Sequence, residues 1–330
     1  MTKENLLVTL ADRNYVEQAK QLFSSVYWNA GWKGDYMLLA HEIPEKDLKW
    51  FRDKGILIKK CKPLYDKMTG SYPPVVFDKF YLFTPEFKKW KNIIYLDADI
   101  IVRASIDNLA DIKGIASSSP LGQKLKFHFY SEDNNDEIKE ITANYNLNKR
   151  PFNSAMMFFS TSIIQDDTFE KIFSLFNRYK NISLGDDPII NLFFYEKWIN
   201  LPPVYNVCVN YFQKYFPKKG IILHFARSSD RVKLPSEKDN IFYNEWKRNL
   251  EKAEFIDLNK IPEGRKFTKF EIFRYSLYLR ITDYTCRTSK KISVYLANAP
   301  DRLIGQIGIL IKKINPRLYY KLKKIKDDRK

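Results

Sequence analysis

The sequence predicts an α/β fold, in which helices cover both faces of a doubly wound, mostly parallel sheet. Along roughly the first hundred residues, short apolar runs typical of buried strands alternate with stretches whose apolar residues have helical spacing. The 330 residues are 45% hydrophobic and 15% aromatic, which suffices for the core of one large domain with an appendage.

The first half of the chain has the clearest patterns. We expect strands at residues 6–10, 36–40, 55–58 and 92–96. Helices are expected at residues 15–29, 44–54 and 76–90; Gly55 ends the second, and the third breaks near Pro85. Strand, helix and strand in succession form βαβ units, which build parallel sheets.

The second half is less regular. Residues 114–150 are expected to form loops, because they include a Ser and Pro run at 117–120 and an acidic stretch at 132–137. We expect a core strand at 152–159, helices at 168–179 and 187–198, and a last buried strand at 220–225.

An acidic pair, Asp97 and Asp99, follows the apolar run at residues 93–96. In extended structure, residues two apart share a face, and open α/β sheets bind ligands at the carboxyl ends of their strands. Two neighbouring carboxylates repel each other unless a cation or a proton neutralises them. The pair therefore indicates a cation site; two solvated acids at a strand end are the alternative.

Several classes of protein are disfavoured by the motifs that are missing. Gly is scarce at 11 residues, and neither Gly-x-Gly-x-x-Gly nor a P-loop is present, which argues against dinucleotide folds and P-loop enzymes. Cys61, Cys208 and Cys286 lack Cys-x-x-Cys spacing and are expected to be reduced. Neither a signal-peptide pattern nor an apolar run of about 18 residues is seen, so we expect a cytoplasmic protein.

The net charge of +17 is concentrated in the last part of the chain, where residues 265–330 contain 18 Lys or Arg against 5 Asp or Glu. Apolar runs flanked by Lys and Tyr, as at residues 303–324, are typical of a segment that lies in a lipid headgroup layer. We expect a main domain at residues 1–264 and a basic amphipathic region at 265–330 that binds an anionic membrane surface. A small helical subdomain with a solvated basic face is the alternative. No nucleic-acid module accompanies the charge, so no nucleic-acid partner is expected.

A series of short segments occurs in an order that is typical of one enzyme family. The segments are residues 11–15, Lys79, and residues 95–99, 105–109, 152–154, 185–191, 201–206 and 223–225. Across roughly residues 5–235 the chain resembles glycosyltransferase family 8, the glycogenin-like and bacterial lipo-oligosaccharide galactosyl- and glucosyltransferases. The resemblance implies a GT-A fold and a retaining enzyme that moves a hexose from a UDP-sugar to an acceptor hydroxyl. In the absence of a P-loop, a Mn²⁺ or Mg²⁺ ion would bridge the diphosphate to the protein.

The resemblance also assigns ligands to that ion. Asp97, Asp99 and His224 supply two carboxylates and an imidazole, a mixed set suited to Mn²⁺. Without its partners, His224 could as well be a core histidine. His41 and His128 are expected to be structural.

A larger set is implied to contact the nucleotide sugar. It comprises Leu10, Ala11, Asp12, Asn14, Tyr15, Lys79, Asp97, Ala98, Asp99, Ser154 and either Arg227 or Lys233. The turn at residues 11–15 would contact uracil and ribose, and Lys79 the phosphate or sugar. The alternatives are helix capping for Asp12 and Asn14, an ordinary solvated side chain for Lys79, and a plain strand-end or β-bulge pair for Asn153 and Ser154.

Asn153, Asp186 and Asp187 are the expected catalytic residues, placed by the resemblance around the donor sugar. Asp187 stands where the family usually has Gln. A carboxylate there could stabilise the positive charge of an oxocarbenium-like transition state, or attack it. The alternative is that Asp187 only caps the helix beginning at Pro188.

The basic tail favours a lipid-linked oligosaccharide or lipopolysaccharide core as acceptor, at the inner face of the cytoplasmic membrane. A haloacid-dehalogenase-type phosphatase, with Asp97 as nucleophile and Asp99 as general acid, is the leading alternative; it leaves Asn153 and His224 without roles. A third possibility is a membrane-associated binding protein without activity, suggested by Arg227, where the family usually has Gly.

Overall fold

The computed structural model describes residues 3–130, 136–209, 220–225, 236–238, 240–298 and 320. Two compact units are distinguished, Met1–Ser276 and Leu277–Lys330. The functional division expected after residue 264 remains a prediction.

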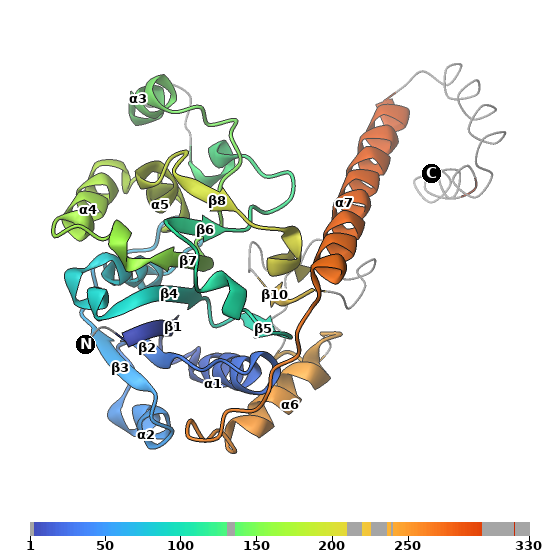
Figure 1. Cartoon of the computed structure of the whole chain (residues 1–330). Coiled ribbons are helices and arrows are strands. Elements are labelled where there is room, and N and C mark those ends of the chain that lie inside the picture. The colour runs from blue at the N-terminus through green and yellow to red at the C-terminus, as the bar shows by residue number, and fades with distance from the viewer. Residues whose placement is uncertain are drawn as a thin grey trace. The chain divides into compact units, whose positions relative to one another are not determined.

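The first unit is built on a seven-stranded, mostly parallel sheet (Figure 1). Its strands are β1 (Lys3–Ala11), β2 (Asp35–His41), β3 (Leu57–Cys61), β4 (Trp90–Leu96), β6 (Ile115–Ser117), β7 (Met156–Ser160) and β8 (Trp198–Asn200). They lie in the order β3-β2-β1-β4-β7-β6-β8. Strands β1 to β4 are parallel to their neighbours within that group, whereas β7 is antiparallel to β4 and β6. The predicted α/β fold is confirmed.

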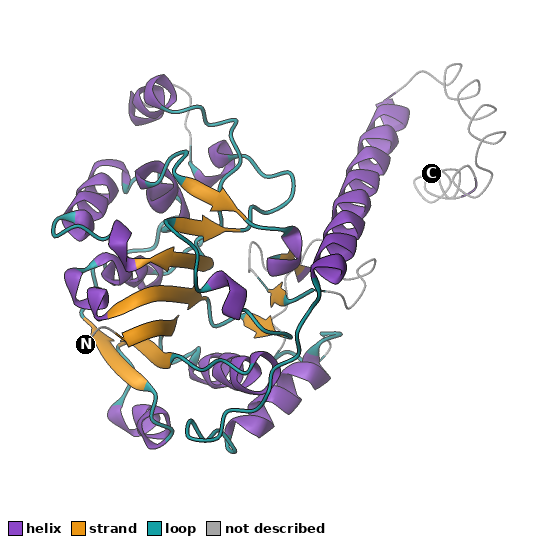
Figure 2. Cartoon of the chain, in the orientation of Figure 1, coloured by secondary structure: helices purple, strands orange, loops and turns teal. Residues whose placement is uncertain are grey.

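Helices α1 (Val16–Ser25) and α2 (Glu45–Asp53) lie against one face of the sheet, and α6 (Tyr243–Ala253) lies beside α1 (Figures 1 and 2). Helix α1 packs on β1 and on α6, and Phe23 of α1 contacts Phe51 of α2 edge-to-face. A π-helical turn, Val26–Ala30, extends α1 up to Gly31. The backbone at Gly264 packs directly against this turn. A Cβ on Gly264 would lie 2.0 Å from the Ala30 carbonyl oxygen, so only glycine fits.

The layer on the other face is rich in aromatic residues. It contains the 3₁₀ helices η2 (Pro74–Phe83) and η3 (Pro85–Lys89) and the helices α4 (Thr168–Tyr179) and α5 (Asp187–Phe193). Leu6 and Val8 of β1 lie in the same buried cluster as Phe77, Phe80 and Phe176. Burial of each such side chain contributes about 1.5–3 kcal/mol, which fixes the strand ends that carry the polar residues described below.

Four stretches differ from the sequence-based expectation. Residues 76–90 break at Pro85 as predicted, but they are 3₁₀ helices instead of α-helix. The expected helix at 187–198 ends at Phe193, and strand β8 follows. Residues 114–150, expected to be loops, contain β6, the 3₁₀ helix η5 (Leu125–His128) and α3 (Asp136–Asn144). Strand β4 ends at Leu96, and the apolar residues after Asp99 form a separate strand, β5 (Ile100–Val102).

A second, three-stranded sheet brings distant segments together. Strand β10 (Ile222–His224) lies between β5, to which it is antiparallel, and β9 (Val207–Cys208), to which it is parallel. In this sheet the residues that directly follow Asp99 lie beside His224.

Helix α7 (Lys269–Asn298) begins in the first unit and continues into the second. Its described part exposes apolar side chains, among them Phe270, Phe273 and Ile281, as well as the cations Arg274 and Arg280. None of the described helices has the length and apolar character needed to cross a membrane. The apolar and basic run expected at residues 303–324 lies outside the described residues, apart from Tyr320.

Candidate active site

The acidic pair lies in a tight turn at the edge of the main sheet. Asp97 directly follows β4, and its N–H donates to the Ala155 carbonyl oxygen at 2.8 Å. Ala98 and Asp99 form the turn into β5, and the Asp99 carbonyl oxygen accepts from the Phe225 N–H at 3.1 Å. The expectation that both acids lie in extended structure was therefore wrong. The turn, and not strand alternation, brings the two carboxylates together.

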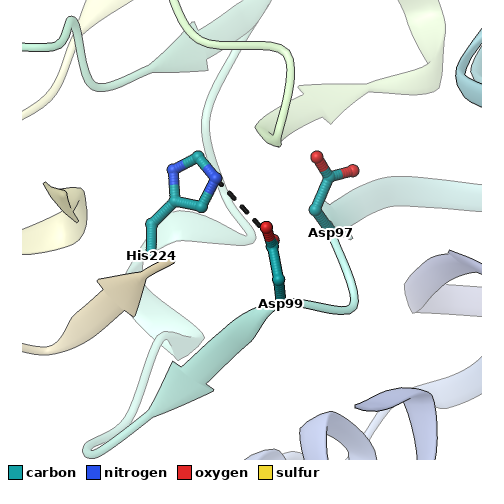
Figure 3. Close-up of side chains that lie close together, drawn as sticks. All are labelled: Asp97, Asp99 and His224. Carbon is teal, nitrogen blue, oxygen red and sulfur yellow. Dashed lines mark ion pairs between the residues drawn. The ribbon is translucent and has the colours of Figure 1, made fainter. Parts of the chain in front are cut away.

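His224 completes a three-residue cluster with these acids (Figure 3). It lies in β10 opposite Ile100, which follows Asp99 directly. Its Nε2 is 3.7 Å from Asp99 Oδ1, and one ligand atom each of Asp97, Asp99 and His224 lies within 4.8 Å of the other two. The predicted convergence of the three side chains is confirmed.

The chemistry of this cluster fits a divalent cation. Asp99 Oδ1 is buried and has no hydrogen-bond partner among the described residues. Burial raises the pKa of Asp99, and the charge of Asp97 raises it further against the opposing effect of His224. Burial lowers the pKa of His224, but hydrogen bonding to Cys208 and the charge of Asp99 outweigh this and raise it to about 9. A bound cation would supply the close ligand contact that Asp99 Oδ1 lacks and would replace the proton on the imidazole.

Two residues without a predicted role hold the cluster in place. Asn206 Oδ1 lies 3.2 Å from His224 Nδ1, and Asn206 Nδ2 donates to the Ser118 carbonyl oxygen at 3.0 Å. This arrangement turns Nε2 of the imidazole towards the acids. The Tyr95 hydroxyl donates to Asp97 Oδ1 at 2.5 Å. The sequence offered both Asn206 and Tyr95 only as members of family segments, without a role for either side chain.

Lys79 links the acidic turn to the second acidic segment. Its Nζ lies 3.1 Å from Asp97 Oδ1 and 3.1 Å from Asp186 Oδ2, and its side chain is only 5% exposed. Burial would lower the pKa of Lys79, but the carboxylates of Asp186 and Asp97 raise it, so the ammonium stays charged. Burial raises the pKa of Asp186 to about 6, against the effect of Lys79. The alternative of an ordinary solvated lysine is excluded.

Asp187 is held from two sides at the start of α5. Its Oδ1 accepts from the Ser154 N–H at 2.5 Å, and its Oδ2 lies 3.4 Å from His128 Nδ1. The neighbouring Asn153 accepts the Ala155 N–H through its own Oδ1 at 2.9 Å. The three predicted catalytic residues are therefore linked: Asp187 accepts from the backbone of Ser154, the residue after Asn153, and Asp186 directly precedes Asp187. His128, expected to be structural only, reaches the side chain of Asp187.

Comparison with known proteins identifies the family. A profile described as glycosyl transferase family 8 matches residues 6–229. The chain belongs to glycosyltransferase family 8. It is 30% identical over 217 residues to Glycosyltransferase GlyB of Streptococcus pneumoniae, covering 62% of this chain and 48% of GlyB. It is 23% identical over 183 residues to Galactinol synthase 2 of Arabidopsis thaliana, covering 50% of this chain and 52% of that protein. The chain thus spans about half the length of the curated relatives it matches.

Solved structures show the same fold. An active-site mutant of LgtC superposes with a TM-score of 0.59 at 17% identity, covering 78% of this chain and 98% of that one. GlyE of Streptococcus pneumoniae superposes with a TM-score of 0.54 at 19% identity, covering 78% of this chain and 62% of that one. These family 8 similarities establish the GT-A fold. They give no support to the alternative of a haloacid-dehalogenase-type phosphatase.

The turn after β1 lies at the same sheet edge, since β1 and β4 are parallel neighbours. Leu10 and Ala11 are buried at the end of β1, and Ala98 is buried in the acidic turn. Asp12 Oδ1 accepts from the N–H groups of Asn14 at 2.8 Å and Tyr15 at 3.2 Å. Asp12 therefore shapes the turn that leads into α1; the N-cap residue of this helix is Tyr15, and no side-chain hydrogen bond caps it.

The nucleotide contacts assigned to residues 10–15 remain predictions. Arg227 and Lys233, the two candidates for a further phosphate contact, lie outside the described residues.

Proposed function

We propose that the protein transfers a hexose, glucose or galactose, from a UDP-sugar to an acceptor hydroxyl, with retention of configuration and with Mn²⁺ as cofactor. The observation that carries this proposal is the cluster of Asp97, Asp99 and His224 at the edge of a GT-A sheet. The buried oxygen Oδ1 of Asp99 supports a cation there, because among the described residues it has only a 3.7 Å ion pair with His224 and no hydrogen bond, and a buried carboxylate oxygen without a hydrogen bond is costly. Family 8 membership supplies the reaction class.

The residues around the cluster divide the work of binding the donor. A cation held by Asp97, Asp99 and His224 would neutralise the charge that develops on the departing diphosphate. The turn at residues 11–15 would bind uracil and ribose. The ammonium of Lys79, held between Asp97 and Asp186, would keep Asp186 ionised and positioned to accept hydrogen bonds from hydroxyls of the donor sugar.

Asn153, Ser154 and Asp187 would surround the reacting end of the sugar. Asp187 is fixed by the Ser154 N–H, and one of its oxygens remains directed towards His128. A carboxylate in this position would stabilise positive charge on the anomeric carbon as the bond to the diphosphate breaks. The departing phosphate oxygen would accept the proton of the acceptor hydroxyl on the same face, which retains the configuration.

The acceptor we propose is a lipid-linked oligosaccharide, such as a lipopolysaccharide core, reached at the inner face of the cytoplasmic membrane. The support is the excess of basic residues after residue 264 and the exposed apolar and cationic side chains of α7. Such a surface binds anionic lipid headgroups peripherally. Deleting residues 265–330 should abolish binding to vesicles containing anionic lipid while sparing UDP-sugar hydrolysis; unchanged sedimentation with those vesicles contradicts the membrane proposal.

The test of the reaction uses UDP-glucose and UDP-galactose, each with Mn²⁺ and with EDTA. We expect one of the two donors to be hydrolysed slowly without acceptor, only when Mn²⁺ is present, and to raise the melting temperature of the protein. Asp97→Asn should lose both effects, whereas Asp111→Asn, at an exposed position away from the cluster, should keep them. Absence of both hydrolysis and stabilisation by either donor would exclude the proposed activity.

A further inference from the structure

A cavity with its own lining lies at the end of α3. It has a volume of about 690 Å³ and is bounded by η5, α3 and the residues that follow α3. This volume is within the range of about 300–1,000 Å³ that small-ligand sites occupy. None of the residues assigned to the donor or to the cation lines it.

The lining combines apolar and amide side chains with one cation, Lys126. Phe129, Tyr145 and Leu147 supply apolar surface, and Asn144, Asn146 and Asn148 supply amides. A pyranose ring has an apolar face of C–H groups and a rim of hydroxyls that both donate and accept hydrogen bonds. Aromatic and aliphatic surface beside amides complements both features.

The three amides are fixed by local hydrogen bonds that leave one end of each available. Asn144 Nδ2 donates to the Glu140 carbonyl oxygen at 2.9 Å, so its Oδ1 remains an acceptor. Asn146 Oδ1 accepts from the Asn148 N–H at 3.0 Å, and Asn148 Oδ1 accepts from Lys124 Nζ at 3.3 Å. Within the described part of the chain, the Nδ2 groups of Asn146 and Asn148 have no hydrogen-bond partner. An acceptor and two donors are thus held ready for a polar ligand, which lowers the entropy cost of binding.

One short backbone segment joins the cavity to the candidate active site. The Leu184 N–H donates to the His128 carbonyl oxygen at 3.0 Å, and the Tyr130 N–H donates to the Ile182 carbonyl oxygen at 2.8 Å. These bonds tie residues 128–130 to the strand-like residues just before Asp186 and Asp187. Phe129 lines the cavity, while the preceding His128 reaches Asp187. Residues 128–130 therefore contribute to both the cavity and the proposed reaction centre.

We infer that this cavity is a glycan subsite that binds a neutral hexose unit of the oligosaccharide acceptor. The inference rests on the proposed function for its biological meaning, but the binding itself is independent of the donor. The amides match the hydroxyls of an uncharged sugar, and the described lining contains no carboxylate to bind a cationic one. The one cation of that lining, Lys126, holds its ammonium 5.5 Å from the ring centroid of Phe127, which does not line the cavity.

The test measures binding of neutral sugars directly. Wild-type protein is applied to an immobilised array of neutral hexose di- and trisaccharides, and the sugars bound are confirmed by saturation-transfer NMR. We expect at least one to bind, and Asn144→Ala/Asn148→Ala to bind it roughly tenfold more weakly, since two hydrogen bonds are lost. Asn244→Ala, on the exposed face of α6, is the matched control and should bind as wild type does.

Both substituted asparagines are exposed, so an unchanged melting temperature is expected; if it falls, Asn148→Ala alone replaces the double variant. No binding of any neutral sugar by wild type, or equal binding by the double variant, overturns the subsite. UDP-sugar hydrolysis by wild type is measured alongside. Hydrolysis without sugar binding overturns the subsite and leaves the proposed function standing. Sugar binding without hydrolysis supports the subsite and contradicts the proposed function.

Discussion

The cation cluster and the glycan cavity are built in different ways. The cluster is placed by two sheets: Asp97 follows β4, Asp99 precedes β5, and His224 lies in β10. The cavity is placed by a 3₁₀ segment, the end of α3 and the irregular residues after it. Regular ladders and a buried core fix the first, whereas a few local hydrogen bonds fix the second.

The difference separates two kinds of residue. Side chains in the cluster are buried charges that depend on one another, because each would be costly alone. The three asparagines that line the cavity are exposed and neutral, and each can be changed with little effect on folding. Substitutions in the cluster should therefore have large effects on activity and on the neighbouring charged residues. Substitutions on the cavity side should have small effects that are confined to one property.

The largest effect is expected for Asp99→Asn. The substitution removes one charge from the cation cluster, and we expect loss of roughly 1,000-fold in kcat/KM for hydrolysis or transfer. Asp111→Asn should match wild type. Activity within tenfold of wild type for Asp99→Asn would show that the cluster does not hold a catalytic cation.

Lys79→Met should destabilise the fold as well as reduce activity. It leaves Asp97 and Asp186 close together without their shared ammonium, which should cost about 3–5 kcal/mol in the free energy of unfolding. Urea unfolding measures the loss, with Lys46→Met at an exposed position of α2 as the control. Equal loss in both variants would contradict the mutual dependence of the buried charges.

Asn206→Ala tests the orientation of the imidazole. Removing the oxygen that contacts His224 Nδ1 should weaken Mn²⁺ binding by about 10–100-fold while leaving the three ligands in place. Titration calorimetry with Mn²⁺ gives the Kd, with Asn244→Ala as the control. An unchanged Kd would show that β10 alone orients the ring.

Mn²⁺ affinity should also rise with pH. The pKa of His224 is raised to about 9 in the metal-free protein, so at neutral pH the imidazolium must lose a proton before it can bind a cation. Between pH 7 and pH 8, both below that pKa, the Kd should fall about tenfold. Calorimetry in buffers of different ionisation enthalpy should detect release of about one proton. A Kd independent of pH in this range is incompatible with a protonated His224.

The smallest effect is expected for His128→Asn, on the side of the cavity. The contact of 3.4 Å with Asp187 is long, so its loss should lower transfer by roughly threefold to tenfold without altering the Kd of Mn²⁺. Steady-state kinetics and calorimetry on the same preparation separate the two quantities. A weaker Mn²⁺ site in this variant would mean that the two sides are not independent.

The sequence predicted the side of the molecule that regular strands build. The apolar run before Asp97 and the short strand around His224 indicated buried strand ends, and the order of family segments paired them. Strand alternation was nevertheless the wrong reason for the closeness of Asp97 and Asp99, because the chain turns at Ala98.

The other side could not be predicted in the same way. His128 and Asp187 are far apart in sequence, and their contact depends on the hydrogen bonds of residues 128–130 to residues 182–184. No periodicity marks such a pairing. The role of Asn206 was hidden for a similar reason: an asparagine after a Pro-rich turn predicts the turn, and only the fold shows that its side chain meets His224.

A crystal of the protein grown with Mn²⁺ and UDP, with diffraction recorded at the manganese absorption edge, tests the central claim most directly. We predict one strong anomalous peak in contact with Asp97, Asp99 and His224 and with both phosphates of UDP. A peak elsewhere, or UDP bound without any peak at these three side chains, would contradict it.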